Sequence, residues 1–203
     1  MNFTKRCFHF TNPDNVVQTL PSVVVDLRSL NFDDPYNEMR RSVTGLNSGQ
    51  FIKATGKLSV SAYGEIEQQP EFFFSGAPFA KPEIAKRLLF KFGDQVQTFE
   101  VECPDPKILE EYIAVNFTRT IDCIDFERSD FVRHRADPRF ISAFYRMELH
   151  EEKIPCEPCI FRPMHAVNYL LVNEAAAVIL REIGFEDDWL RSVIGIESER
   201  DNL

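Results

Sequence analysis

The sequence predicts an α+β fold in which many short strands accompany two main helices. Apolar and β-branched runs of strand length recur along the whole chain, whereas apolar residues follow a helical spacing in only two segments, at about residues 81–92 and 174–184. The predicted strands and helices do not alternate regularly. This order favours an α+β fold over a doubly wound parallel sheet.

The chain is expected to fold as one domain. Its 203 residues can bury a sizeable core, and the sequence has neither an internal repeat nor a low-complexity linker. Within residues 1–203 we expect a mostly β N-terminal lobe at 1–76, a mixed sheet with the two helices at 77–195, and a disordered tail at 196–203.

Short strands dominate the first 76 residues. Turn signals separate apolar runs there, among them Asn12-Pro13-Asp14, Thr55-Gly56 and Ser75-Gly76. A single helical turn is expected at Tyr36–Arg41. The predicted strands are Lys5–Phe10, Ser22–Leu27, Phe51–Ala54, Lys57–Tyr63 and Glu71–Phe74.

The first main helix is predicted at residues 81–92. Ile84 and Leu88 lie on one face at helical spacing. Pro82 suits the first turn of a helix, because its missing N–H would have no partner there, and Gly93 is a typical C-terminal stop.

Further strands and the second helix follow. Asn173 is a good N-cap and Gly184 a good stop for a helix at 174–184. We expect a polar surface loop or frayed helix after Phe126, and a short helix around Trp189. The buried stripe of the second helix is predicted to be Ala175, Val178, Ile179 and Ile183. The predicted strands are Gln95–Glu102, Glu111–Thr118, Thr120–Phe126, Ser142–Leu149, Cys159–Arg162 and Asn168–Val172.

The net charge of −9 arises entirely from the second half. Residues 101–203 hold 12 basic and 21 acidic residues, whereas residues 1–100 hold 11 of each. An acidic half argues against nucleic-acid binding, which needs clustered Lys and Arg, and it suits a basic partner or solubility. No apolar run of membrane-spanning length or signal peptide is present, so we expect a cytoplasmic protein with five reduced cysteines and no membrane contact.

Four acidic residues lie close together near the middle of the chain. Such a group could bind Mg²⁺ or Ca²⁺, but Arg128 interrupts it and no calcium-loop glycine is present. We favour structural polar positions, with Arg162 as the pairing partner of Asp122 or Asp125, and predict no metal site. The four are Asp122, Asp125, Glu127 and Asp130.

A second group combines Cys156 and Cys159 with His150 and His165. Its order could supply four zinc ligands, but the spacing does not match known zinc fingers. We favour a structural turn with two small thiols, and zinc binding is the alternative. The sequence also has no nucleophile elbow, phosphate-binding glycine loop or dinucleotide fingerprint, so we predict no catalytic residue and no cofactor.

Several segments of the second half resemble a known family in their order and spacing. They are PEIAKRLLFKFGDQVQTFEVE from Pro82, EYIAVNFTRTIDCIDFERS from Glu111, IFR from Ile160 and YLLVNEAAAVILREIGF from Tyr169. Over about residues 75–186 the chain resembles the immunity proteins of bacterial polymorphic toxins, family eleven, formerly a domain of unknown function. The resemblance makes residues 77–195 the immunity-like part. Its polar positions are Asn116, Asp122, Asp125, Ser129 and Arg162.

The resemblance implies a non-enzymatic inhibitor that binds and neutralises a cognate protein toxin. A basic toxin would suit the acidic half of the chain. We expect Glu186, Asp187, Asp188 and Trp189 to form part of the contact surface, with the indole as an anchor beside three acids; the alternative is a buried Trp189. This chain departs from the family at EDDWLRSV, where a glycine-rich strand is expected.

Two other functions remain as alternatives. One is a metal-dependent hydrolase that uses Asp122 and Asp125. The other is a subunit of a larger assembly, in which exposed phenylalanines at Phe72–Phe74 dock on a neighbour.

Overall fold

A computed structural model describes residues 6–13, 22–32, 46, 49–63, 69–103, 107–135 and 137–193. Strands dominate and two main helices accompany them, which confirms the α+β class. The chain forms two compact units, which we call the central unit (Asn12–Thr118) and the terminal unit (Met1–Thr11 with Arg119–Leu203). The boundary expected at residues 76 and 77 does not separate these units, because the strands on either side of it pair with each other.

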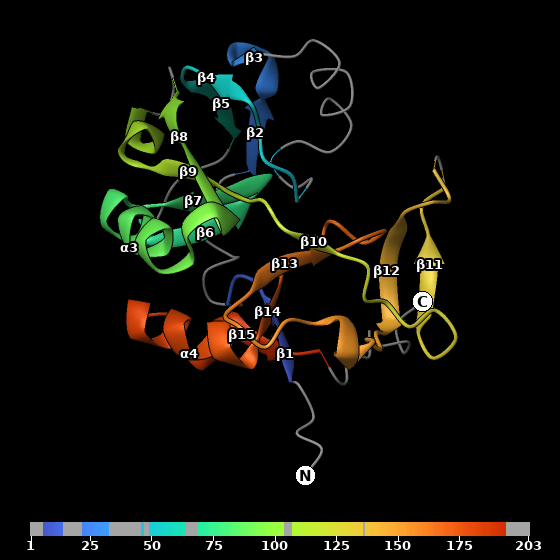
Figure 1. Ribbon diagram of the computed structural model, residues 1–203. Coiled ribbons are helices and arrows are strands. Elements are labelled where there is room, and N and C mark those ends of the chain that lie inside the picture. Colours follow the sequence, from blue (N-terminus) through green and yellow to red (C-terminus); the bar gives the residue numbers. More distant parts are fainter. Residues whose placement is uncertain are drawn as a thin grey trace. The chain divides into compact units, whose positions relative to one another are not determined.

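The central unit contains a six-stranded sheet in the order β2-β5-β8-β9-β7-β6 (Figure 1). Only the β5–β8 pair is parallel. These strands are β2 (Ser22–Asp26), β5 (Leu58–Tyr63), β6 (Phe72–Ser75), β7 (Ala77–Ala80), β8 (Val96–Glu102) and β9 (Ile113–Phe117). A separate pair is formed by β3 (Asn31–Phe32) and β4 (Ala54–Thr55).

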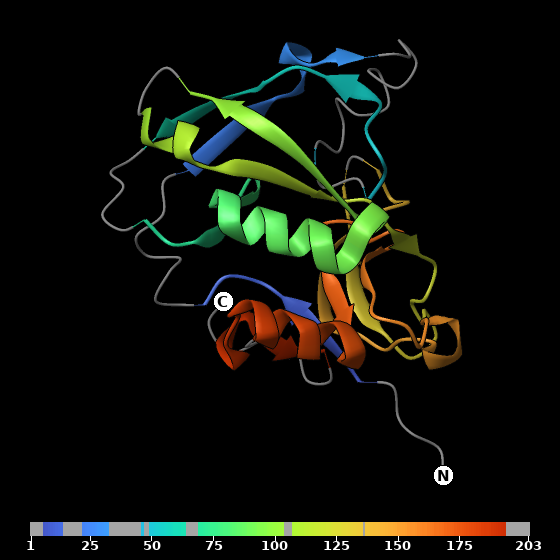
Figure 2. The same ribbon diagram turned by 60° about the vertical axis from the view of Figure 1, so that its left-hand side comes forward.

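Helix α3 (Pro82–Phe92) packs against β7, β8 and β9 (Figure 2). It buries Ile84 and Leu88, and the N–H of Gly93 donates to the carbonyl of Leu89 at its C-terminus. The helix therefore lies where the sequence predicted it. Aromatic rings fill the core of this unit: Phe73 stacks on Phe79 and meets Tyr112 edge-on, each at a centroid distance of 5.2 Å.

The terminal unit contains a five-stranded sheet in the order β10-β13-β14-β1-β15, parallel only between β10 and β13. The first strand of the chain thus lies between two of the last. The strands are β1 (Cys7–Phe10), β10 (Thr120–Ile121), β13 (Ile160–Pro163), β14 (Leu171–Asn173) and β15 (Leu190–Ser192). A separate antiparallel hairpin is formed by β11 (Asp130–Arg133) and β12 (Ile141–Arg146) (Figure 1).

Helix α4 (Glu174–Ile183) begins at the predicted N-cap, where the Asn173 carboxamide oxygen accepts the N–H of Ala176 at 2.9 Å. It ends at Gly184, whose backbone is left-handed. The predicted buried stripe is wrong by a fraction of a turn, since Val178 is 51% exposed. The buried residues are Ala176, Ala177, Leu180 and Ile183.

Several predicted elements need correction. The strand expected at Thr120–Phe126 ends at Ile121, and β7, β11 and β15 were not predicted at all. The helix expected around Trp189 is a single 3-10 turn. The helical turn expected at Tyr36–Arg41 and the tail at 196–203 lie outside the described residues. The 3-10 segments are η1 (Leu27–Ser29), η3 (Gly93–Gln95), η4 (Lys107–Glu111), η5 (Glu151–Lys153) and η6 (Asp187–Trp189).

In the described part of the chain, every helix is too short or too polar to cross a membrane. Phe72 and Phe73 are each only 2% exposed. The exposed phenylalanine patch expected at Phe72–Phe74 is therefore wrong, because two of its three rings belong to the core of the central unit.

Candidate functional site

Asp125 organises a tight turn on the terminal unit. Its carboxylate accepts the backbone N–H groups of Glu127 and Arg128, both at 3.1 Å, and its carbonyl accepts the N–H of Ser129 at 2.9 Å. The backbone of Asp125 is also held by Glu148, because its N–H donates to the Glu148 carbonyl at 2.9 Å. These bonds satisfy a buried carboxylate within the turn, so Asp125 is a structural residue.

The pairing of Arg162 with Asp122 or Asp125 stays a prediction. Asp122 is exposed, and the Asp125 carboxylate accepts backbone N–H groups of its own turn. The Arg162 guanidinium is buried and donates to the carbonyl of Val167 at 2.6 Å. Its removal from water lowers the pKa of Arg162 to about 9.

Asn116 is a second buried polar position, in the central unit. Its amide donates to the carbonyl of Gln50 at 2.8 Å and to the side-chain oxygen of Gln97 at 3.1 Å. Gln97 in turn bonds both backbone groups of Ile52, at 2.9 and 2.6 Å. This pair of amides fastens the segment before β4 to β8 and β9, which is a structural role.

The stretch Glu186–Trp189 lies at the surface of the terminal unit, directly before edge strand β15. The three acids are exposed, and Asp187 pairs with Arg181 at 2.7 Å. Trp189 is half-buried. Its ring lies 5.5 Å from that of Phe185 and 6.2 Å from that of Phe10, measured between centroids. The stretch thus combines exposed carboxylates with a partly accessible indole.

The four side chains of the alternative zinc site do not form a metal site in the described part of the chain. The Nδ1 of His165 contacts the carbonyl of Arg139, whereas His150 lies beside Glu152. Cys159 is buried, and loss of hydration raises the pKa of its thiol to about 11, so the thiolate that zinc needs is disfavoured. Among the described residues, no three His, Cys, Asp or Glu side chains are placed to hold a metal ion.

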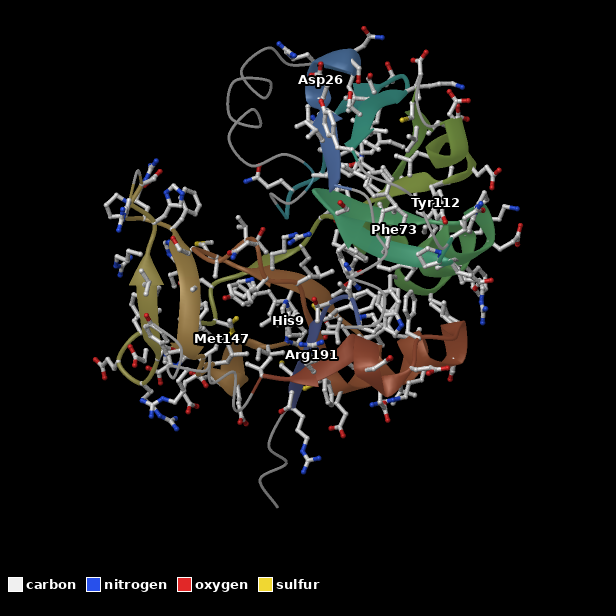
Figure 3. All side chains as sticks on the ribbon, turned by 180° about the vertical axis from the view of Figure 1, so that it is seen from behind. His9, Asp26, Phe73, Tyr112, Met147 and Arg191 are labelled. Carbon is white, nitrogen blue, oxygen red and sulfur yellow. The ribbon has the colours of Figure 1, made fainter. Side chains whose placement is uncertain are left out.

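Two further titratable groups lie within the terminal unit. His9 lies opposite Arg191 in the register of β1 and β15 (Figure 3). The centroid of its ring lies 5.3 Å from that of Tyr169. Burial, with Arg191 and Arg162 nearby, lowers the pKa of His9 to about 4. Burial raises the pKa of Cys123 to about 12. At neutral pH both groups are uncharged, so neither resembles an activated nucleophile or a cationic acid.

A cluster of aromatic rings and one guanidinium was missed by the sequence analysis. Phe126 meets Phe131 at 5.7 Å and His165 at 5.6 Å, edge-on in both cases. The Arg133 guanidinium lies 5.1 Å from the Phe131 ring centre and 5.7 Å from that of Phe126. We call these four residues the Arg133 cluster. The alternation of Phe131 and Arg133 was the available signal, but the surrounding arginines made the segment resemble a loop.

No protein-family model matches the chain, and no curated protein matches it.

Proposed function

We propose that the chain is an immunity protein, which binds a cognate bacterial toxin in the cytoplasm of the producing cell and neutralises it by stoichiometric contact. The resemblance of residues 75–186 to immunity protein family eleven supports this proposal. The structural observation that supports the proposal most is the stretch Glu186–Trp189, where three exposed acids precede a half-buried indole. Tryptophan with a polar rim is typical of binding hot spots.

The polar groups in the interior agree with a binding role. Asp125 stabilises a turn, and Arg162 donates to a backbone carbonyl. The Cys123 thiol has a raised pKa, and that of His9 is lowered. Asp125 therefore has a structural role, and burial disfavours the charged forms of Cys123 and His9. An inhibitor needs none of them for chemistry, only a complementary surface of roughly 800 Å² per partner.

The acidic charge of the chain favours a toxin with a basic contact surface. The second half of the chain carries the whole net charge of −9, and the acids before Trp189 are exposed. Opposite charges speed diffusional encounter more than they strengthen the final complex. A toxin with a basic contact surface would therefore associate fastest with this chain.

Co-expression tests the proposal. The gene beside this one is expressed in a host from an inducible promoter, with and without this chain. Growth arrest by the neighbour alone, and rescue by this chain, is the expected result. Rescue must also disappear when an unrelated acidic protein replaces the chain. Arrest that persists despite a folded, expressed chain would overturn the proposal.

A further inference from the structure

The hairpin β11–β12 differs in charge from the rest of its half of the chain. Residues 126–146 contain five arginines and three acidic residues, whereas residues 101–203 as a whole are strongly acidic. Two of these arginines are neutralised locally: Arg139 pairs with Asp137 at 2.7 Å, and Arg128 lies 3.6 Å from Glu148. Of the other three, Arg146 lies opposite Asp130 at the start of β11 and donates to the carbonyl of Arg128, so the end of β11 carries the charge of two arginines.

Arg133 and Arg135 supply this charge. Both are exposed, and within the described ranges neither forms an ion pair with a carboxylate. The Arg133 side chain is held in place from two sides, because it donates to the carbonyl of Pro138 at 2.8 Å and lies near the two rings of its cluster. A guanidinium held in this way loses less side-chain entropy when it binds a carboxylate.

An exposed aromatic ring lies beside this charge. Phe126, whose ring centre is 5.7 Å from the Arg133 guanidinium, is 37% exposed, and Met164, next to His165 in the sequence, is 44% exposed. Arginine, aromatic rings and methionine are the residues enriched at protein interfaces. The accessible Phe126 ring lies beside Arg133, which has no carboxylate partner in the described structure. This combination is typical of a surface that binds another protein.

The backbone at His165 gives a second, independent observation. His165 has a φ of 70°, the one positive φ at a described residue other than glycine. Its carbonyl accepts the N–H of Ile141 at 2.7 Å, and its Nδ1 contacts the carbonyl of Arg139 at 3.1 Å. Left-handed backbone is uncommon outside glycine and costs free energy, and residues strained in this way cluster at active sites and ligand clamps. Here it fixes the base of the hairpin beside Phe126.

We propose that the hairpin β11–β12 is a docking surface for an acidic segment of a partner protein. Arg133 and Arg135 pair with carboxylates of that segment, and Phe126 contacts its apolar side chains. This inference rests on the proposed function, since the occupant is the protein that the chain binds. The chain then contacts the partner through a basic surface on the hairpin and an acidic surface at Glu186–Trp189. The partner must therefore carry acidic residues for the first and basic residues for the second.

An acidic peptide tests the docking surface without the toxin. A short peptide that alternates Glu with Phe is titrated into the isotope-labelled chain at low salt, and amide shifts are followed by NMR. Saturable shifts confined to residues 126–146 and their neighbours at 164–165 are expected, and they should vanish at high salt. No saturable shift, or equal shifts with a peptide that alternates Lys with Phe, would overturn the inference.

Variants locate the contact. Arg133→Ala with Arg135→Ala should weaken peptide binding at least about tenfold, because two charge-assisted contacts are lost. Arg133→Lys keeps the charge but not the planar group, so it should weaken binding less. The matched control, Lys86→Ala with Arg87→Ala on α3, removes two positive charges elsewhere and should bind normally. Unchanged binding by the hairpin double variant would refute the assignment.

Two further measurements separate this inference from its alternatives. Tighter binding of single-stranded oligothymidylate than of the peptide would make the hairpin a nucleic-acid surface and overturn the proposal. Failure of the wild-type chain to rescue growth, with peptide binding at the hairpin intact, would overturn the immunity function and leave the docking surface supported. Circular dichroism of each variant confirms that it is folded.

Discussion

The backbone N–H of Val23 donates a hydrogen bond of 2.9 Å to the hydroxyl oxygen of Ser75. Val23 belongs to β2 and Ser75 to β6, which are the two edge strands of the six-stranded sheet. This bond covers part of an edge that would otherwise offer unpaired backbone groups to another chain. The sheet therefore approaches closure at the turn that joins β6 to β7.

Gly76→Ala should destabilise the central unit strongly. Gly76 has a φ of 65°, and a Cβ built there would lie 2.3 Å from the carbonyl oxygen of Val23. Strained backbone and a backbone clash together should cost about 3 kcal/mol or more, measured by urea denaturation.

Gly56→Ala is the matched control for this prediction. Gly56 also has a positive φ, of 104°, but a Cβ there would meet its nearest neighbour, the Asn31 amide nitrogen, at an ordinary 3.7 Å. Gly56→Ala should lower the free energy of unfolding only by the cost of placing alanine in left-handed backbone, about 1–2 kcal/mol. Equal losses in the two variants would show that the clash with Val23 has no effect.

Asn173→Ala should unfold part of the terminal unit at lower denaturant concentration. Its oxygen accepts the N–H groups of Ala176 and Cys159, at 2.9 and 3.1 Å, and its amide donates to the carbonyls of Pro155 and Glu157, at 2.9 and 2.7 Å. Losing a helix cap and leaving buried groups unsatisfied should cost about 3 kcal/mol. Chemical denaturation followed by circular dichroism measures it.

Asn168→Ala serves as the comparison for Asn173. Asn168 is exposed, and its side-chain amide makes a long contact of 3.4 Å with the carbonyl of Ser142. Its replacement should change stability by less than about 0.5 kcal/mol. A loss as large as that of Asn173→Ala would contradict the role given to the buried cap.

His9 should make stability fall in mild acid. Its pKa is lowered from 6.5 to about 4 in the folded state, so the unfolded chain binds the proton first. The stabilisation is complete above pH 6.5 and is lost as the pH falls from 6.5 toward 4. Between about pH 7.5 and about pH 5 the loss attributable to His9 should be about 2 kcal/mol.

His9→Gln removes this titration. Urea denaturation at each pH should give a flatter stability profile for the variant than for the wild type over this window. Parallel profiles would mean that His9 is not the group that protonates on unfolding.

Reversal of the three acids before Trp189 should slow association with the toxin. Glu186→Lys, Asp187→Lys and Asp188→Lys together remove the local attraction for a basic surface, so the association rate should fall by roughly tenfold at low salt and little at high salt. Stopped-flow kinetics measures the rate. Unchanged kinetics would remove this stretch from the interface.

A charge-matched control distinguishes this local effect from net charge. Glu71→Lys, Glu102→Lys and Glu110→Lys change the same total charge at exposed positions of the central unit. This variant should associate nearly as fast as the wild type. An equal slowing in both variants would assign the effect to net charge alone.

The sequence predicted the helices well because their signals are local. Pro82 and Gly93 bound α3, and Asn173 and Gly184 bound α4, as the structure has them within a residue. The buried face of α4 was misjudged, because Val178 is apolar yet exposed, and only tertiary packing decides which apolar residues of such a helix are covered.

The strands that were missed depend on distant partners. Strand β7 contains Pro78 and follows a turn signal, yet it pairs with both β6 and β9. Strand β15 pairs with β1 from the other end of the chain, which no local pattern can reveal. The same reason explains the Arg133 cluster, where the ring of His165 meets that of Phe126 from a distant segment.

Under the proposed function, one molecule of this chain neutralises one molecule of toxin by binding it. Calorimetric titration of the purified toxin domain into the chain, with toxin activity assayed at each point, tests it most directly. We expect a single transition at an equimolar ratio and loss of activity that parallels complex formation. Toxin activity that persists when the chain is in excess, or absence of heat at micromolar concentrations, would contradict the claim.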